Sequence, residues 1–119
     1  MKLYKIIYSD KNPERLLQVC GELRFAEGFT GRLFGLIFKN IKRGQGFVIR
    51  DCNSIHTFWM RYRIDVVFLN KNNEIVKLYE SLKQFRMTPV IKAAYCVLEF
   101  PEFTIKDLSL KTGDKLKFV

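Results

Sequence analysis

Short apolar segments alternate with turn-forming residues along most of the chain, and this pattern predicts a mainly β domain. The candidate strands span residues 2–8, 16–25, 47–50, 64–69, 75–82, 95–100 and 115–118. In the last of these, Leu116 and Phe118 face one way while Lys115 and Lys117 face the other. Turns recur at the spacing expected for a sandwich or a barrel, and no repeat or linker divides the chain. We therefore expect a single domain over residues 1–119.

The segment 64–69 is apolar on both faces, which indicates a strand that is covered on both sides. The position of its one charged residue, Asp65, requires an explanation, because charge next to a buried strand is normally at an end or paired. After this strand, the asparagine-rich residues 70–74 predict a hairpin into the strand 75–82, since asparagine tolerates positive φ.

One short helix is predicted within residues 28–38. Thr30 can cap this helix, and the apolar residues 33, 34, 37 and 38 fall on one face. Gly35 disfavours the helix slightly but would let a strand lie close to it. A second glycine, Gly21, suggests a bulge or bend within the strand 16–25.

The composition fits a compact domain of one core, with 119 residues and 48% hydrophobic residues. No stretch approaches the ~18 uninterrupted apolar residues of a membrane span, and the N-terminal segment lacks the apolar region of a signal peptide. The three cysteines, Cys20, Cys52 and Cys96, suit reduced thiols better than a disulfide framework. We expect a cytoplasmic protein without a membrane partner.

The net charge of +9 raises the prospect of a nucleic acid partner. The lysines and arginines are nevertheless scattered through all quarters of the chain, and there is no basic tail. An evenly basic, solvated surface explains this distribution better. Nucleic acid is therefore an alternative partner that the charge pattern does not favour.

The chain resembles the bacterial and archaeal family catalogued as domain of unknown function 192, over residues 25–118. The resemblance is carried by five pieces in order, at residues 32–36, 52–60, 64–69, 97–101 and 113–114. It implies a compact, mostly β domain of jelly-roll type, and thus a jelly-roll-like sandwich or barrel with one short helix. It implies no established activity.

The chain departs from the family pattern in three turns. Asp51 stands where the family often has a proline, and Asn70 stands where it often has an aspartate. The pair Glu102-Phe103 follows Pro101 at a place where the family commonly has Ala-Gly. These departures question the geometry of loops more than the fold.

A candidate ligand-binding surface gathers the polar and aromatic residues that the strands do not explain. We assign to it Arg32, Trp59, Arg61 and Asp65, with Cys52 and His56 at its rim. Arg32 and Asp65 are expected to pair, as a structural clamp or as the polar floor of a pocket. Structural roles are expected for Gly35, Met60, Glu99 and Asp114.

Residues 58–63 form an aromatic and basic stretch that we expect to be a strand. On a strand, Trp59, Arg61 and Arg63 would share one face, while Phe58, Met60 and Tyr62 would take the other. Exposed tryptophan beside arginine would suit stacking of single-stranded nucleic acid or sugar. The alternative, that Trp59 packs in the core, is the more common arrangement in a small β domain.

Other chemistry receives weaker support. Cys52 and His56 would suit a thiol hydrolase only if Asp65 or Glu99 oriented the base, and sequence spacing does not supply that geometry. Cys20, Cys52, His56 and Cys96 have the composition of a zinc site but lack the usual close ligand pairs. Glu99 and Asp114 could be paired carboxylates, yet nothing in the sequence fixes their separation.

The sequence therefore predicts a small, non-enzymatic binding or accessory domain for a small polar molecule or a protein segment. A nucleic-acid-binding module and a hydrolase that uses Cys52 and His56 are the alternatives. No catalytic residue, metal or cofactor is assigned, and the oligomeric state stays open.

Overall fold

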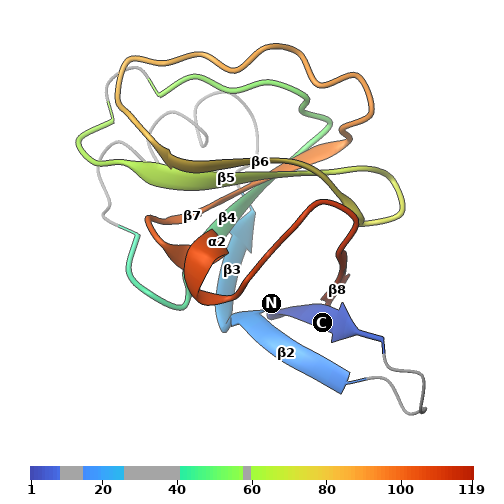
Figure 1. Ribbon diagram of the computed structural model, residues 1–119. Helices are drawn as coiled ribbons and strands as arrows, with labels where there is room; N and C mark the ends of the chain where they lie inside the picture. Colours follow the sequence, from blue (N-terminus) through green and yellow to red (C-terminus); the bar gives the residue numbers. More distant parts are fainter. Residues whose placement is uncertain (9–14, 26–40, 58–59) are drawn as a thin grey trace.

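The protein is a sandwich of two β-sheets in the computed structural model, which describes residues 1–8, 15–25, 41–57 and 60–119 (Figure 1). The strands are β1 (Leu3–Ile7), β2 (Arg15–Cys20), β3 (Glu22–Phe25), β4 (Gln45–Arg50), β5 (Ile64–Leu69), β6 (Ile75–Leu82), β7 (Cys96–Pro101) and β8 (Lys115–Phe118). The smaller sheet has the order β2-β1-β8, and the larger has the order β3-β4-β7-β5-β6. The mainly β prediction is confirmed, and the sheets form a sandwich and not a closed barrel.

The larger sheet is antiparallel except at its edge, where β3 runs parallel to β4. Every residue of β5 is buried, as the apolar pattern on both of its faces predicted. The hairpin between β5 and β6 is also confirmed. The side-chain oxygen of Asn70 accepts the backbone N–H groups of Asn72 and Glu74, and Asn73 adopts a φ of 62°.

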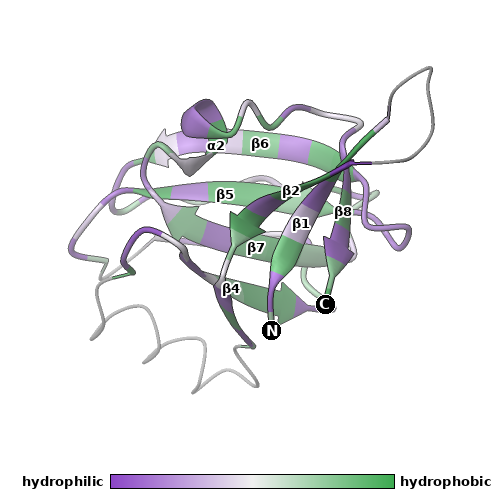
Figure 2. Ribbon diagram, turned by 90° about the horizontal axis from the view of Figure 1, so that it is seen from below, coloured by the Kyte–Doolittle hydropathy of each residue, from purple (hydrophilic) through white to green (hydrophobic). Residues whose placement is uncertain are grey.

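Two hydrophobic cores lie on the two faces of the larger sheet, and apolar positions recur along the strands of both sheets (Figure 2). The core between the sheets includes Leu3, Leu98 and Leu116. The outer core includes Val66 and Phe68, and it is closed by residues of the connecting segments. The strand alternation predicted for residues 115–118 is confirmed, since Leu116 is buried and both lysines are exposed.

The chain changes sheets at Gly21. The backbone N–H groups of Gly21 and Glu22 both donate to the carbonyl of Gly44, each at 3.0 Å. The prediction of one bent strand over residues 16–25 is therefore wrong in part, because the bend separates β2 in one sheet from β3 in the other. Which sheet receives each half depends on distant partners that local patterning does not show.

The two ends of the chain lie side by side in the smaller sheet (Figure 1). Lys2 and Val119 exchange both of their backbone hydrogen bonds, each at 2.8 Å. This pairing extends the antiparallel contact between β1 and β8 to the last residue.

A short helix, α2 (Thr104–Asp107), follows β7. The helix predicted within residues 28–38, together with its Gly35, lies outside the described residues. No helix in the part of the chain that the structure describes has the length and hydropathy needed to cross a bilayer.

Candidate functional site

Asp65 is buried completely, and its carboxylate is held by backbone amides. Its Oδ1 accepts the N–H of Ser81 and its Oδ2 accepts the N–H of Ile105, both at 2.8 Å. The backbone of Phe103 lies near enough to lower the pKa of this carboxyl. The expected partner Arg32 lies outside the described residues, so the ion pair remains a prediction. The carboxylate acts as a clamp through the amides of Ser81 and Ile105.

The amides that Asp65 holds come from two irregular places. β6 carries an extra residue opposite Asp65, and Ser81 in this bulge has a φ of 51°. Phe103, which precedes α2, has a φ of 77°. Desolvation raises the pKa of the Asp65 carboxyl, and the neighbouring backbone amides oppose this shift. One carboxylate therefore fixes both a strand bulge and the start of a helix.

A cleft of about 540 Å³ opens beside the segment that Asp65 holds. Its lining consists of Ile41, Arg61, Tyr62, Arg63, Pro101, Glu102 and Phe103. Both arginines are exposed, and the Phe103 ring is 54% exposed. The residues that support this cleft come from the C-terminal end of β7 and from the segment before β5. The cleft thus combines two cations with an aromatic surface.

The arginines project from an irregular segment and not from a strand, so the strand predicted for residues 58–63 is wrong for the described residues 60–63. The predicted alternation nevertheless holds there, because Met60 is buried and Tyr62 is half-buried while both arginines face solvent. Phe58 and Trp59 lie outside the described residues.

Tyr62 anchors this segment to the body of the domain. Its phenol is hydrogen-bonded to the backbone of Ile41, and burial raises the pKa of this phenol, with the nearby Glu99 carboxylate adding to the shift. Glu99 is only 3% exposed. The position of the two arginines is therefore set by Tyr62, the residue between them, whose side chain packs inward.

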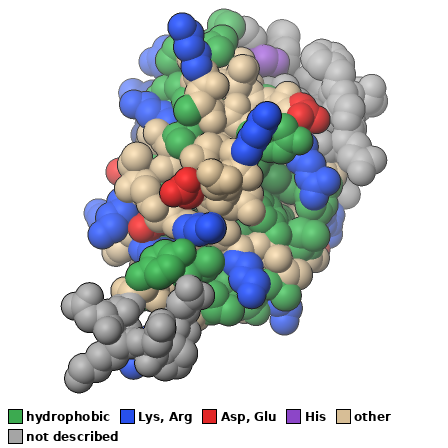
Figure 3. Space-filling view, turned by 90° about the vertical axis from the view of Figure 1, so that its right-hand side faces the viewer, with side chains coloured by type: hydrophobic (Ala, Val, Ile, Leu, Met, Phe, Trp, Pro, Cys, Tyr) green, Lys and Arg blue, Asp and Glu red, His purple; other side chains and the backbone are tan. Residues whose placement is uncertain are grey.

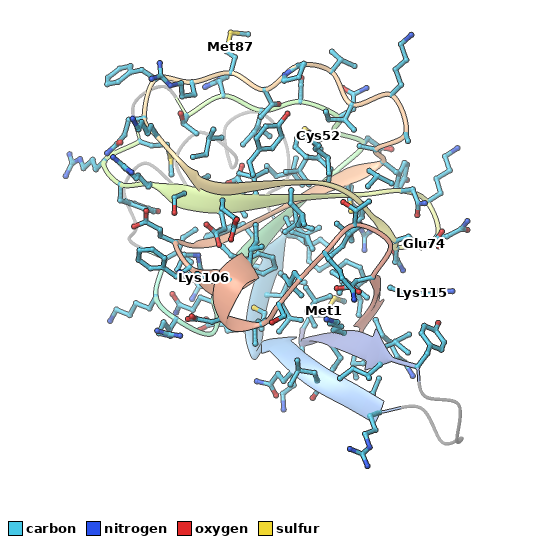
Figure 4. The ribbon with its side chains drawn as sticks, in the orientation of Figure 1. Met1, Cys52, Glu74, Met87, Lys106 and Lys115 are labelled. Atoms are coloured by element: carbon cyan, nitrogen blue, oxygen red, sulfur yellow. The ribbon has the colours of Figure 1, made fainter. Side chains whose placement is uncertain are left out.

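Cys52 and His56 have different surroundings. The Cys52 thiol lies in the outer core, beneath the connecting segments (Figure 4), and donates a hydrogen bond of 3.0 Å to the carbonyl of Ser54. His56 is exposed, and its backbone forms an isolated bridge with Met87. A thiol nucleophile needs a base within hydrogen-bond reach, and the Cys52 thiol is bonded to a backbone carbonyl instead. This arrangement gives no support to thiol catalysis.

The remaining candidate clusters do not converge in the described parts of the chain. All three cysteines are buried and none is in a disulfide. No three His, Cys, Asp or Glu side chains among the described residues are placed to hold a metal ion. Asp114 pairs with Lys5 at 3.1 Å and accepts the N–H of Lys111, so it fixes the turn before β8. Glu99 lies on the face of the larger sheet that is directed away from Asp114, so the two carboxylates do not form a pair.

Sequence reasoning found Arg61 and Asp65 but missed Phe103, which connects them. The signal was present, because Phe103 occupies the position where the family commonly has glycine, and its φ of 77° is a conformation that glycine adopts freely. This difference from the family pattern, which lies in a turn, thus corresponds to a side chain that lines the cleft.

The fold and the described side chains define a small β-sandwich domain with a basic, aromatic cleft. The chain belongs to the DUF192 family, described as an uncharacterized ACR, whose model matches residues 11–118. The resemblance found in the sequence is therefore confirmed. This family has no assigned function.

The chain is similar to proteins of Pyrococcus species and to two solved structures. It is 38% identical to a UPF0127 protein of Pyrococcus furiosus over 82% of this chain and 86% of that protein. It is 34% identical to one of Pyrococcus horikoshii over 90% and 96% of the two chains.

Two solved structures share the fold. A protein of unknown function from Novosphingobium aromaticivorans has a TM-score of 0.74 at 14% identity, covering 98% of this chain and 84% of its own. A protein of Sinorhizobium meliloti, provisionally described as a transcription regulator, has a TM-score of 0.72 at 17% identity, with 98% and 92% covered. At these identities the likeness shows the fold alone.

Proposed function

We propose that this domain is a non-enzymatic binding module that recognises an anionic group, a carboxylate or phosphate, in the cleft formed by Arg61, Arg63 and Phe103. The observation that carries the proposal is the conformation of Phe103. A non-glycine residue in the left-handed region costs about 1–3 kcal/mol, and such strain tends to persist where the side chain has a use.

The chemistry of the cleft suits an anion with a flat or apolar body. Guanidinium groups bind carboxylate and phosphate through two parallel hydrogen bonds. The exposed ring of Phe103 offers a face for stacking, and the Tyr62 phenol adds a polar group at the same cleft. Arg32 and Trp59 remain candidates for this surface on the strength of the sequence alone.

The proposal of binding without catalysis follows from the side chains that line the cleft. Besides the arginines and Tyr62, the titratable lining residue is Glu102. A hydrolytic centre needs a nucleophile or an activated water together with a base held at hydrogen-bond distance. The described lining contains neither a thiol nor a histidine. Cys52 and His56 are not among the residues that line it.

Calorimetric titration of the purified protein with inorganic phosphate, citrate and a short single-stranded DNA tests this function. We expect citrate or phosphate to bind, and Phe103→Gly and Arg61→Ala each to weaken that binding by roughly tenfold. Arg15→Ala is the matched control, because it removes an exposed arginine from the other sheet. Absence of anion binding, or equal loss in all three variants, would reject the proposal.

Nucleic acid binding is the second candidate, because the net charge of +9 raises the prospect of such a partner even though the basic residues are scattered. In the same titration it predicts that the DNA binds far more tightly than phosphate, with an affinity that falls steeply as salt is raised. DNA binding that is weak or insensitive to salt would remove this candidate.

A further inference from the structure

A second cavity, of about 280 Å³, lies at the opposite end of β7 from the basic cleft. Its lining consists of Val48, Arg50, Asn73, Tyr95, Cys96 and Phe118. Cys96 is the first residue of β7 and Pro101, which lines the basic cleft, is the last. The two cavities are therefore separate sites.

The walls of this cavity come from both sheets. Val48 and Cys96 belong to the larger sheet, and Phe118 belongs to β8 of the smaller one. Their side chains give the cavity an apolar inner surface with a single thiol. An apolar cavity of about 150 Å³ holds a benzene molecule, so this one has room for a ring that carries a small polar group.

The backbone beside the cavity is fixed at Asn73. Its N–H donates to the carbonyl of Asn70, and its own carbonyl accepts the N–H of Leu116 from β8 at 2.9 Å. Asn73 also has a φ of 62°. Because its N–H is engaged within the hairpin and its carbonyl is engaged by β8, the backbone of Asn73 is fixed beside the cavity.

Arg50 supplies a cation that is positioned in advance. Its guanidinium lies 4.5 Å from the centre of the Phe25 ring, a stacked arrangement that restricts the side chain. A second cation, Lys71, lies 5.8 Å from the centre of the Tyr95 ring. The nearby carboxylate, Asp51, raises the pKa of the Tyr95 phenol, which places it beside that phenol. The rim therefore favours an anion.

On the face of the molecule that is seen from the right of Figure 1, lysines and arginines are spread among apolar and uncharged side chains (Figure 3). The volume of the cavity, about 280 Å³, suits a small molecule.

We infer that this cavity binds a small organic monoanion, whose apolar ring or short chain packs against Val48, Cys96 and Phe118 while its carboxylate meets Arg50 and the Asn73 amide. The binding is non-covalent. Burial raises the pKa of the Cys96 thiol to about 11, so the sulfur stays protonated and does not attack the ligand. This site is independent of the function proposed for the basic cleft.

The test is a titration of the isotope-labelled protein with benzoate, followed by amide chemical shifts. We expect the shifts to gather at residues 48–50, 73, 95–96 and 118, and the neutral isostere benzamide to bind at least roughly tenfold more weakly. This comparison uses the unaltered protein, so it does not depend on whether a variant folds.

Two variants locate the anion. Arg50→Gln is expected to weaken benzoate binding at this cavity by roughly tenfold, whereas Arg15→Gln, which removes an exposed arginine of β2, leaves it unchanged. The inference is overturned if benzoate and benzamide bind equally, if no binding occurs, or if the shifts gather at residues 61–63 and 101–103. The last result would instead support the basic cleft.

Discussion

Asp65 and Ile105 lie forty residues apart in the sequence, and the Ile105 N–H donates to the Asp65 carboxylate at 2.8 Å. Ile105 lies in the first turn of α2, where the backbone N–H groups have no partner within the helix. The Phe103 position that precedes α2 offers no side-chain oxygen to cap it. A carboxylate from the larger sheet therefore takes the role of the missing cap.

Replacing Asp65 should destabilise the domain more than its single charge suggests. In Asp65→Ala the amides of Ser81 and Ile105 lose their acceptors, and we expect a loss of about 2–4 kcal/mol in the free energy of unfolding. Urea denaturation measures this loss. Glu80→Gln, on the exposed side of the same bulge, should change stability little. Equal stability of Asp65→Ala and wild type would contradict the clamp.

The same carboxyl should make stability depend on pH. Because burial raises the pKa of folded Asp65 above its ordinary 3.8, its contribution is fully present below that value and is lost as pH rises through the folded pKa. We expect the stability gap between wild type and Asp65→Asn to be wider at about pH 4 than at about pH 7. Urea unfolding at a series of pH values gives this stability gap. A gap that widens as the pH rises would show that folding lowers the pKa of Asp65 and does not raise it.

Relieving the strain at Phe103 should stabilise the protein while removing its binding surface. Glycine adopts a φ of 77° without the clash of a β-carbon, so Phe103→Gly should raise the free energy of unfolding by about 1 kcal/mol. Calorimetric melting tests this expectation. Phe85→Gly is an informative comparison, because Phe85 also has positive φ but lies away from the cleft. A Phe103→Gly protein that is less stable would show that the ring itself supports the fold.

The three thiols should react slowly in the folded protein. With a pKa of about 11, the Cys96 thiol is ionised in about one molecule in ten thousand at about pH 7. Burial also raises the pKa of Cys20, and Cys52 donates to a carbonyl. Thiol titration with a disulfide reagent should show reaction only after unfolding.

A positive control for that titration is Thr112→Cys, which places a thiol at an exposed turn. It should react at the rate of an ordinary free cysteine. A native thiol that reacts as fast and maps to Cys52 would restore the hydrolase hypothesis.

Thr57 should hold the long connection between β6 and β7 against the body of the domain. Its hydroxyl donates to the carbonyl of Lys83 at 2.6 Å and accepts the N–H of Arg86 at 2.9 Å. Thr57→Val keeps the shape but removes both bonds, and we expect a cost of about 1–3 kcal/mol. Limited trypsin digestion should then cut sooner within residues 83–92. Thr112→Val, at an exposed site, should leave the digestion pattern unchanged.

The parts of the fold that local chemistry determines could be predicted from the sequence. The burial of β5 follows from its apolar residues, and the hairpin follows from Asn70 and Asn73, whose side chain and φ the structure confirms. The division of residues 16–25 between two sheets could not be predicted, because the choice depends on pairing with β1 and β4, which are distant in sequence.

The helix α2 and the cleft were beyond prediction for a related reason. A helix of four residues is too short to show a periodic pattern, and Asp65, its capping group, precedes it by about forty residues. Arg61 and Asp65 could be selected from the sequence because each carries a charge that the predicted strands do not explain. Their relation through Phe103 arises only in the folded chain.

The mutual pairing of Lys2 and Val119 makes the backbone nearly a closed ring. A linker of a few residues could join these positions without disturbing β1 or β8, and the chain could be opened instead at the exposed tip of the hairpin around Lys71 and Asn72. A circular permutant of this kind would present its new ends beside the rim of the second cavity. A reporter attached there would sense events at that cavity and leave the basic cleft at the far end of β7 unobstructed.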